Sequence, residues 1–141
     1  MVSSTRLPHP AGTPVPRVRQ EAPPLSCTVY YNSACPVCDA GIEAQRRRMP
    51  GVQVDWIDVH TQPESTEALG TSLASVRERL HLRDAQGQVH VGLDALAWLW
   101  AQTPRQRPLA WLARRTAWLG RPAYRCLARW LYRWNRSQGH W

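Results

Sequence analysis

Residues 27–38 read CTVYYNSACPVC, and this stretch decides the fold of the chain. The run 27–31 is β-branched and aromatic and is followed by turn-forming residues, so it predicts a buried strand. Pro36 suits the first turn of a helix. Residues 37–49 are rich in Ala, Glu, Gln and Arg and stop at a Pro-Gly pair. A helix is therefore expected to begin at the two cysteines of this stretch.

The chain then continues as alternating strand and helix patterns. Residues 52–57 alternate between apolar and polar side chains, which predicts a second strand, and residues 63–79 are helix-like but interrupted at Gly70. Two short alternating runs around an Asp-Ala-Gln-Gly turn predict a hairpin, and an apolar helix follows it. The hairpin strands are 80–83 and 88–91, and the helix is 93–101. We expect the hairpin histidines, His81 and His90, on its polar face.

This order of elements predicts the fold class. It is α/β, with a βαβ unit, a β-hairpin and a closing helix, which is the layout of the thioredoxin fold. We assign residues 27–102 to a thioredoxin-like redox domain. Residues 103–141 form an Arg- and Trp-rich helical segment that we expect to pack on the same domain.

The chain length and the composition of the N-terminal residues indicate how many domains to expect and where they begin. A chain of 141 residues suits one domain. Residues 1–26 hold six of the 12 prolines and show no apolar periodicity, so we predict a disordered Pro-rich extension. The chain offers neither the apolar core of a signal peptide nor the run of about 18 apolar residues that a membrane span needs. We therefore expect a cytoplasmic protein.

The four cysteines are too few for a disulfide scaffold, and only Cys35 and Cys38 form a close pair. Such a pair in a chain without an export signal favours redox or metal chemistry. At a helix start, unpaired amide N–H groups and the helix dipole stabilise a thiolate, which lowers the usual pKa of about 8.5. Cys35 is therefore the predicted exposed nucleophile. Cys38, one turn further along, is the predicted, more sheltered resolving thiol.

A CxxC pair also permits two other interpretations, a zinc site and a merely structural pair of thiols. Tetrahedral zinc requires two further ligands, and structural sites usually supply them as a second closely spaced pair. This chain has no second pair. The candidates would be His60, His81, His90, Cys27 and Cys126. The position of the pair between a strand and a helix favours the redox interpretation, for which we expect no metal and no cofactor.

The stretch YYNSACPVC, residues 30–38, resembles the signature of the DCC family of thiol-disulfide oxidoreductases. Later blocks match that family in order, so the likeness covers about residues 28–134. These later blocks are VDWIDV at 54–59, RLHL at 79–82 with a Gly87 turn, and VGLDAL at 91–96. The resemblance implies a thioredoxin-like fold and a disulfide oxidoreductase role for Cys35 and Cys38. The expected partner is a protein or small-molecule disulfide or thiol.

The chain departs from the expected pattern at two places. The family usually has Asp-Gly ahead of the cysteines, where this chain has Asn32-Ser33. Loss of that carboxylate removes a proton acceptor and a negative charge, and we expect it to make Cys35 more acidic. Typical thioredoxins also place a loop proline opposite the CxxC. The stretch before Leu80 has none, so we expect substrate to dock differently.

Four other residues carry chemistry that packing or solvation explains more simply. Cys27 and Cys126 are isolated, and isolated cysteines are usually buried, so we expect both to pack in the interior. His60 follows the second predicted strand and is expected in solvent rather than as an acid or base. Asp94 falls in the first turn of a helix, where a carboxylate suits the helix dipole.

The C-terminal segment, residues 103–141, holds nine Arg, no acidic residue and five of the eight Trp. In its last predicted helix, apolar residues recur at i, i+3, i+4 and i+7 (Leu127, Trp130, Leu131 and Trp134) while Arg occupies another face. We place a break between its two helices at Gly120-Arg121-Pro122. Three uses fit this composition: packing on the core, peripheral contact with an anionic membrane, and, least favoured, nucleic-acid binding.

The extension gives a first testable prediction. A shortened chain that begins at Leu25 should fold and unfold at the same temperature as the full chain, because residues 1–24 bury too little apolar surface to offset their ordering entropy. Limited proteolysis followed by mass spectrometry should find the first cuts in this region. A large drop in the melting temperature of the shortened chain would show that the extension is part of the fold.

Overall fold

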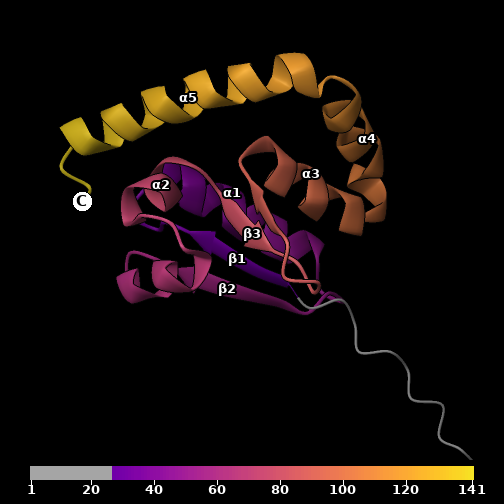
Figure 1. Cartoon of the computed structure of the whole chain (residues 1–141). Coiled ribbons are helices and arrows are strands. Elements are labelled where there is room, and N and C mark those ends of the chain that lie inside the picture. Colours follow the sequence, from indigo (N-terminus) through magenta and orange to yellow (C-terminus); the bar gives the residue numbers. More distant parts are fainter. Residues whose placement is uncertain (1–26) are drawn as a thin grey trace, which may run out of the picture.

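The computed structural model describes residues 27–141, so the predicted disorder of residues 1–26 lies outside the described part. A four-stranded sheet is covered by helices on both faces (Figure 1). The elements, in order, are β1 (Cys27–Tyr31), α1 (Pro36–Arg48), β2 (Val54–Asp58), η1 (Pro63–Leu69), α2 (Leu73–Glu78), β3 (His81–Arg83), β4 (Val89–Val91), α3 (Leu93–Gln102), η2 (Pro104–Gln106), α4 (Arg107–Arg115) and α5 (Ala117–Ser137).

The sheet order is β2-β1-β3-β4, with β1 and β2 parallel and the other pairs antiparallel. This is the thioredoxin-like arrangement that the sequence predicts, with β1 at its centre. The predicted βαβ unit, hairpin and closing helix are all present. Asp84 makes the hairpin turn, because its Oδ1 accepts hydrogen bonds from the backbone N–H groups of Gln86 at 3.0 Å and Gln88 at 2.9 Å.

Alternate residues of β1 supply two cores. Val29 faces Ile42 of α1 and Leu99 of α3 in the larger core, whereas Tyr30 faces Val59 and Val76 on the opposite side of the sheet. A strand at the centre of a two-sided sheet has no solvent face. The uninterrupted apolar character of residues 27–31 reflects that position.

The second core corrects the expectation for His81. This residue pairs with Tyr30 across the sheet and is only 3% exposed, because η1 and α2 cover that face. Burial lowers the pKa of the His81 imidazole, although its Nδ1 lies 2.8 Å from the Arg79 carbonyl oxygen. His90, by contrast, is half-buried, and its Nε2 lies 2.9 Å from Asp84 Oδ2.

The C-terminal segment forms two helices, as expected, but the predicted break is in the wrong place. It lies at Thr116, and α5 runs without interruption through Gly120 and Pro122. Gly120 serves close packing instead, since a Cβ there would lie 2.7 Å from Leu93 Cδ2. Pro122 is the sixth residue of α5 and lies inside the helix, where it cannot donate the usual backbone hydrogen bond to the Trp118 carbonyl.

α5 lies along the outside of the molecule and contacts α3, α4 and α2 (Figure 1). Its inward residues differ from the predicted apolar face. They include Tyr124, Ala128, Leu131 and Asn135, while Leu127, Trp130 and Trp134 are exposed. None of the helices within residues 27–141 has the length and hydropathy required to span a bilayer.

Gly92 provides a test of how α5 docks. It has a φ of 64°, which disfavours any residue with a side chain, and a Cβ there would lie 2.9 Å from Cε1 of Tyr124 on α5. Gly92→Ala should lower the free energy of unfolding by about 1–3 kcal/mol, measured by urea denaturation.

Gly41 offers a matched control, because it lies within α1 and a Cβ there would meet no atom within 4 Å. Gly41→Ala should raise the free energy of unfolding by about 0.5–1 kcal/mol through helix propensity. If both substitutions were neutral or stabilising, the close contact between Gly92 and Tyr124 would not hold α5 in place.

Candidate active site

The loop between β1 and α1 brings the two cysteines to the start of a helix. Cys35 is the N-cap of α1, and Pro36 occupies its first turn. The Cys35 Sγ accepts a hydrogen bond from the Cys38 backbone N–H at 3.2 Å. A side-chain oxygen usually makes this contact at a helix start. Here a sulfur makes it, so the helix end directly stabilises negative charge on Cys35.

The two thiols differ strongly in acidity, as the sequence predicts. The pKa of Cys35 is lowered to about 6, first by a hydrogen bond from the Cys38 thiol, against the effect of burial, and then by the Cys38 backbone and the Asn135 amide. The pKa of Cys38 is raised, because its thiol donates to Cys35, is partly buried and lies beside the Cys35 charge. All four cysteines are free thiols, so the structure describes the reduced pair.

The exposure of the two thiols is the reverse of the expectation. Cys35 is 1% exposed, whereas Cys38 is half-buried. The cover on Cys35 includes Asn135, which is also 1% exposed and lies near the end of α5. No local pattern points to this contact, since 100 positions separate the two residues.

Asn135 is held by contacts within the end of α5. Its Nδ2 donates to the Leu131 carbonyl oxygen at 2.9 Å, and its Oδ1 lies 2.7 Å from His140 Nδ1. The chain beyond α5 is held to α2, where the Arg77 guanidinium lies 5.7 Å from the centre of the Trp141 ring. The end of α5 therefore both covers Cys35 and supports the amide that contacts it.

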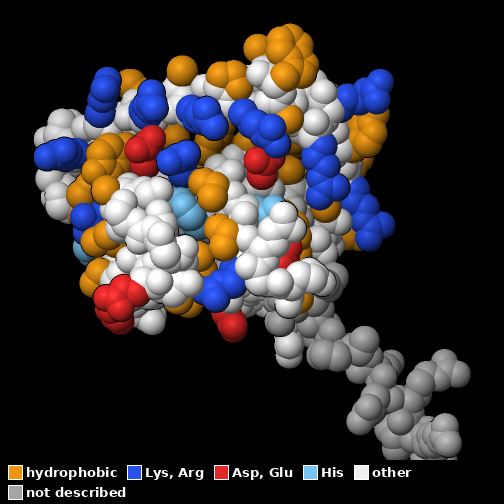
Figure 2. All heavy atoms as spheres, viewed as in Figure 1, with side chains coloured by type: hydrophobic (Ala, Val, Ile, Leu, Met, Phe, Trp, Pro, Cys, Tyr) orange, Lys and Arg blue, Asp and Glu red, His pale blue; other side chains and the backbone are white. Residues whose placement is uncertain are grey.

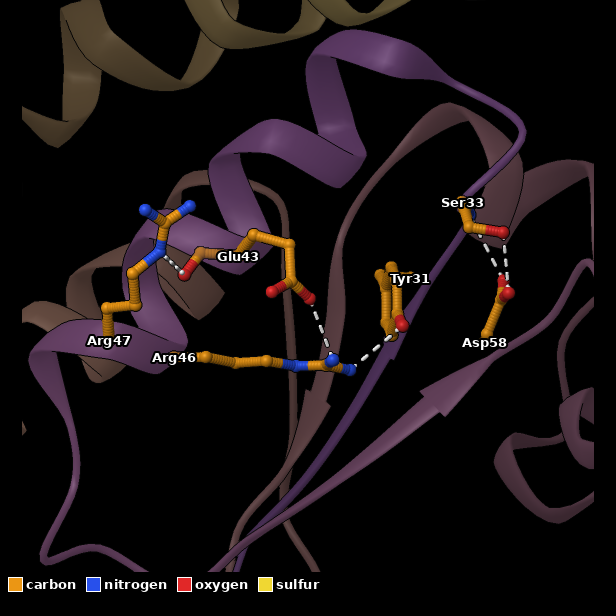
Figure 3. Close-up of polar contacts among 6 residues, drawn as sticks. All are labelled: Tyr31, Ser33, Glu43, Arg46, Arg47 and Asp58. Carbon is orange, nitrogen blue, oxygen red and sulfur yellow. Dashed lines mark hydrogen bonds and ion pairs between the residues drawn. The ribbon is translucent and has the colours of Figure 1, made fainter.

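A carboxylate does reach the loop ahead of the cysteines, although it comes from another strand. Asp58, the last residue of β2, accepts hydrogen bonds from the Ser33 backbone N–H at 3.0 Å and from the Ser33 hydroxyl at 2.5 Å (Figure 3). Burial disfavours its charge, but the bonds from Ser33 and the His60 N–H lower its pKa. Asp58 is thus an ionised anchor of the loop. The block VDWIDV at 54–59 contains Asp58 and is the sequence signal for this anchor.

On the other side of the loop, Arg46 ties α1 to β1. Its guanidinium donates to the Tyr31 hydroxyl and to Glu43 Oε1, both at 2.8 Å (Figure 3). It also lies 5.2 Å from the centre of the Tyr31 ring and 5.1 Å from that of Trp56. These contacts fix the helix relative to the strand that precedes the cysteines.

A cavity of about 390 Å³ lies between α1, α3 and α5, next to the cysteine pair. Its wall is mostly apolar and includes Cys38 and Asn32; further lining residues are Ile42, Leu96, Leu99, Trp100, Leu127 and Leu131. The Asn32 side chain is buried, and its Nδ2 has no hydrogen-bond partner within residues 27–141. This cavity therefore combines an apolar wall, a thiol and a free amide donor.

The other residues weighed from the sequence lie away from the pair or serve the fold. Cys27 packs in the larger core, as expected, and burial, with Asp55 and Asp84 nearby, raises its pKa to about 11. Cys126 is exposed on α5, so the expectation that it packs in the interior was wrong. Its position falls on the outward side of the helix, which no other element of residues 27–141 covers.

His60 and Asp94 match their simpler interpretations. His60 is exposed, and Asp94 lies in the first turn of α3, where its Oδ1 is 3.1 Å from an Arg121 nitrogen. Within residues 27–141, no three His, Cys, Asp or Glu side chains converge as metal ligands would. The residues considered as zinc ligands are therefore not gathered around the cysteine pair.

A sequence model of the family described as DCC1-like thiol-disulfide oxidoreductase matches residues 29–137, which include the cysteine pair and α5. No curated protein and no solved structure matches the chain.

The acidity of Cys35 can be tested through thiolate absorbance at 240 nm. The reduced protein should show a transition near pH 6, with the thiolate present above this pH and lost below it. Cys38→Ala removes the thiol donor, and Asn135→Ala removes the amide. Each should raise the pKa of Cys35 by about one unit, since a hydrogen bond to a charged group is worth about 1.5–3 kcal/mol.

Cys38→Ser is the matched control, because its hydroxyl keeps a donor at the same position. It should change the pKa of Cys35 less than Cys38→Ala does. The absence of a transition near pH 6 in the unaltered protein, or a transition near pH 6 that survives Cys35→Ser, would contradict this assignment of the thiolate.

Proposed function

The chain belongs to the DCC1-like thiol-disulfide oxidoreductase family, and we propose that it exchanges disulfides through Cys35 as nucleophile and Cys38 as resolving thiol. The observation that carries the proposal is the hydrogen bond from the Cys38 N–H to the Cys35 sulfur at the start of α1. It accompanies a Cys35 pKa of about 6, so most of this thiol is ionised at neutral pH.

In the first step the Cys35 thiolate attacks one sulfur of a substrate disulfide. The substrate S–S bond breaks, a mixed disulfide forms at Cys35, and the first substrate thiolate leaves and takes a proton from water. Two influences that hold the proton on Cys38 are its hydrogen bond to Cys35 and the Cys35 charge. Both disappear when Cys35 enters the mixed disulfide, so Cys38 becomes easier to ionise at the step that needs it.

In the second step Cys38 loses its proton and attacks the Cys35 sulfur. The mixed disulfide breaks, the second substrate thiol is released, and Cys35 and Cys38 are left joined by a disulfide. The pair has then passed two electrons to the substrate. A thiol reductant must reduce the pair again, and the same steps in reverse would oxidise a dithiol substrate. We place this chemistry in the cytoplasm, where an isolated close cysteine pair is typical of redox use.

Burial adds a requirement to this scheme, since Cys35 is 1% exposed. For attack, the end of α5 that carries Asn135 must move away from the sulfur. Once the site is open, the adjoining cavity would accept an apolar group of the substrate, and the free Asn32 Nδ2 would donate a hydrogen bond to an oxygen atom next to that group. The substrate is thus a protein or small-molecule disulfide with an apolar group beside its sulfur atoms.

The same burial favours a second candidate, in which the two thiols are only structural. In that case Cys35 would serve as a helix cap and would never exchange with a partner. The two candidates differ in what the Cys38→Ser variant does with a disulfide substrate.

Cys35→Ser should abolish the reduction of insulin by the protein, because the thiol whose pKa is lowered to about 6 is lost. Cys38→Ser should retain the first attack and accumulate a mixed disulfide between Cys35 and the substrate, identified by peptide mass spectrometry. Cys126→Ser is the control, since it removes an exposed thiol outside the pair and should leave the rate unchanged.

Full insulin reduction by Cys35→Ser would overturn the mechanism. The absence of any mixed disulfide in Cys38→Ser, with a normal thiolate transition near pH 6, would favour the structural pair instead.

A further inference from the structure

The outer surface of α4 and α5 carries large apolar side chains that no part of the described chain covers. Trp118 is 79% exposed, Trp130 63% and Trp111 62%. Exposed leucines accompany them at Leu109, Leu112, Leu119 and Leu127. Single exposed apolar residues are ordinary, but a contiguous set of this size marks an interaction surface.

On α5 four exposed apolar residues share one side of the helix, whereas Trp118 projects from the side that carries the arginines. At 3.6 residues per turn, Leu119, Leu127, Trp130 and Trp134 fall within an arc of about 80°. We call these four residues the apolar stripe. The side that packs against the domain is a different one, with Ala128 and Asn135 buried. Packing on the core therefore does not account for the stripe.

Arginines line the neighbouring side of the same helix. They are Arg125, Arg129, Arg133 and Arg136, and all four are exposed. Figure 2 shows a row of basic side chains along α5, with hydrophobic side chains beyond it at the upper edge of the molecule. Of the nine Arg in residues 103–141, only Arg121 and Arg129 form ion pairs within the described part of the chain.

The positive charge of the arginines on this surface indicates which kind of partner fits it. A second copy of the chain would bring nine Arg against nine Arg with no acidic residue from the segment to balance them. A nucleic acid would satisfy the Arg side chains but leave the leucines of the surface in water. An anionic lipid surface satisfies both, because tryptophan and leucine enter the boundary between headgroups and acyl chains while arginine binds the phosphates.

We propose that α4 and α5 form a docking surface for anionic membranes, with the apolar stripe inserted at the lipid interface and the Arg row against the headgroups. The long Arg side chains can extend from the side of α5 toward the phosphates while their apolar stems cover the stripe. The surface faces away from Cys35, so docking leaves the cysteine pair on the protein side of the helix.

The test is cosedimentation of the full chain with vesicles of phosphatidylcholine, with and without phosphatidylglycerol. Binding is expected to the anionic vesicles only, and it should weaken as salt rises, because the Debye length shortens. Trp130→Ala with Trp134→Ala, both in the apolar stripe, should weaken binding at least about tenfold. Arg133→Gln with Arg136→Gln should weaken it roughly fivefold for each arginine.

Two control variants remove arginine charge or an apolar side chain outside α4 and α5. Arg47→Gln with Arg48→Gln, at the end of α1, lowers the net charge equally, and Val89→Ser removes an exposed apolar residue from β4. Both should leave binding within about twofold of the unaltered chain. Circular dichroism of every variant checks that its fold is kept.

Three results would overturn the proposal. The first is equal binding to neutral and anionic vesicles, or none to either at low salt. The second is a stable dimer that the two Trp substitutions convert to monomer. The third is tighter binding to duplex DNA than to the anionic vesicles, with the Trp substitutions without effect.

Discussion

A single sulfur atom organises the start of α1. The Cys35 Sγ caps the helix by accepting the Cys38 N–H, and the same atom is the one that must carry charge for disulfide exchange. A capping atom is most effective when it is negative, and a thiolate is most stable where helix amides point at it. A negative charge on the Cys35 sulfur therefore favours both the stability of the helix start and the reactivity of the thiol.

The rest of the domain keeps that sulfur in place and covers it. Asp58 anchors the loop before it, and Arg46 fixes α1 against β1. α5 then contributes Asn135 over Cys35, Leu131 to the wall of the cavity, and the apolar stripe on the outside, of which Leu127 also reaches the cavity. A single helix, α5, therefore carries both the residue that covers Cys35 and the proposed docking surface.

Local patterns predicted most of the sheet and the identity of the cysteine pair. Strand and helix periods, the Asp84 turn and the Pro after Cys35 each depend on residues close in sequence. What the sequence could not reveal depends on contacts between distant segments. The burial of His81 follows from η1 and α2, and the cover on Cys35 follows from Asn135, a hundred positions away. Gly120 suggested a helix break, but it is a contact point for Leu93.

The reduction potential of the Cys35–Cys38 pair tests the central claim most directly. Equilibration in glutathione or dithiothreitol buffers, with the disulfide located by peptide mass spectrometry, should give one two-electron transition that joins these two cysteines. A thiolate with a pKa near 6 stabilises the reduced form, so the potential should lie between about −270 mV, typical of thioredoxin, and about −120 mV, typical of strongly oxidising periplasmic enzymes. A protein whose Cys35 and Cys38 never join in any buffer would contradict the account.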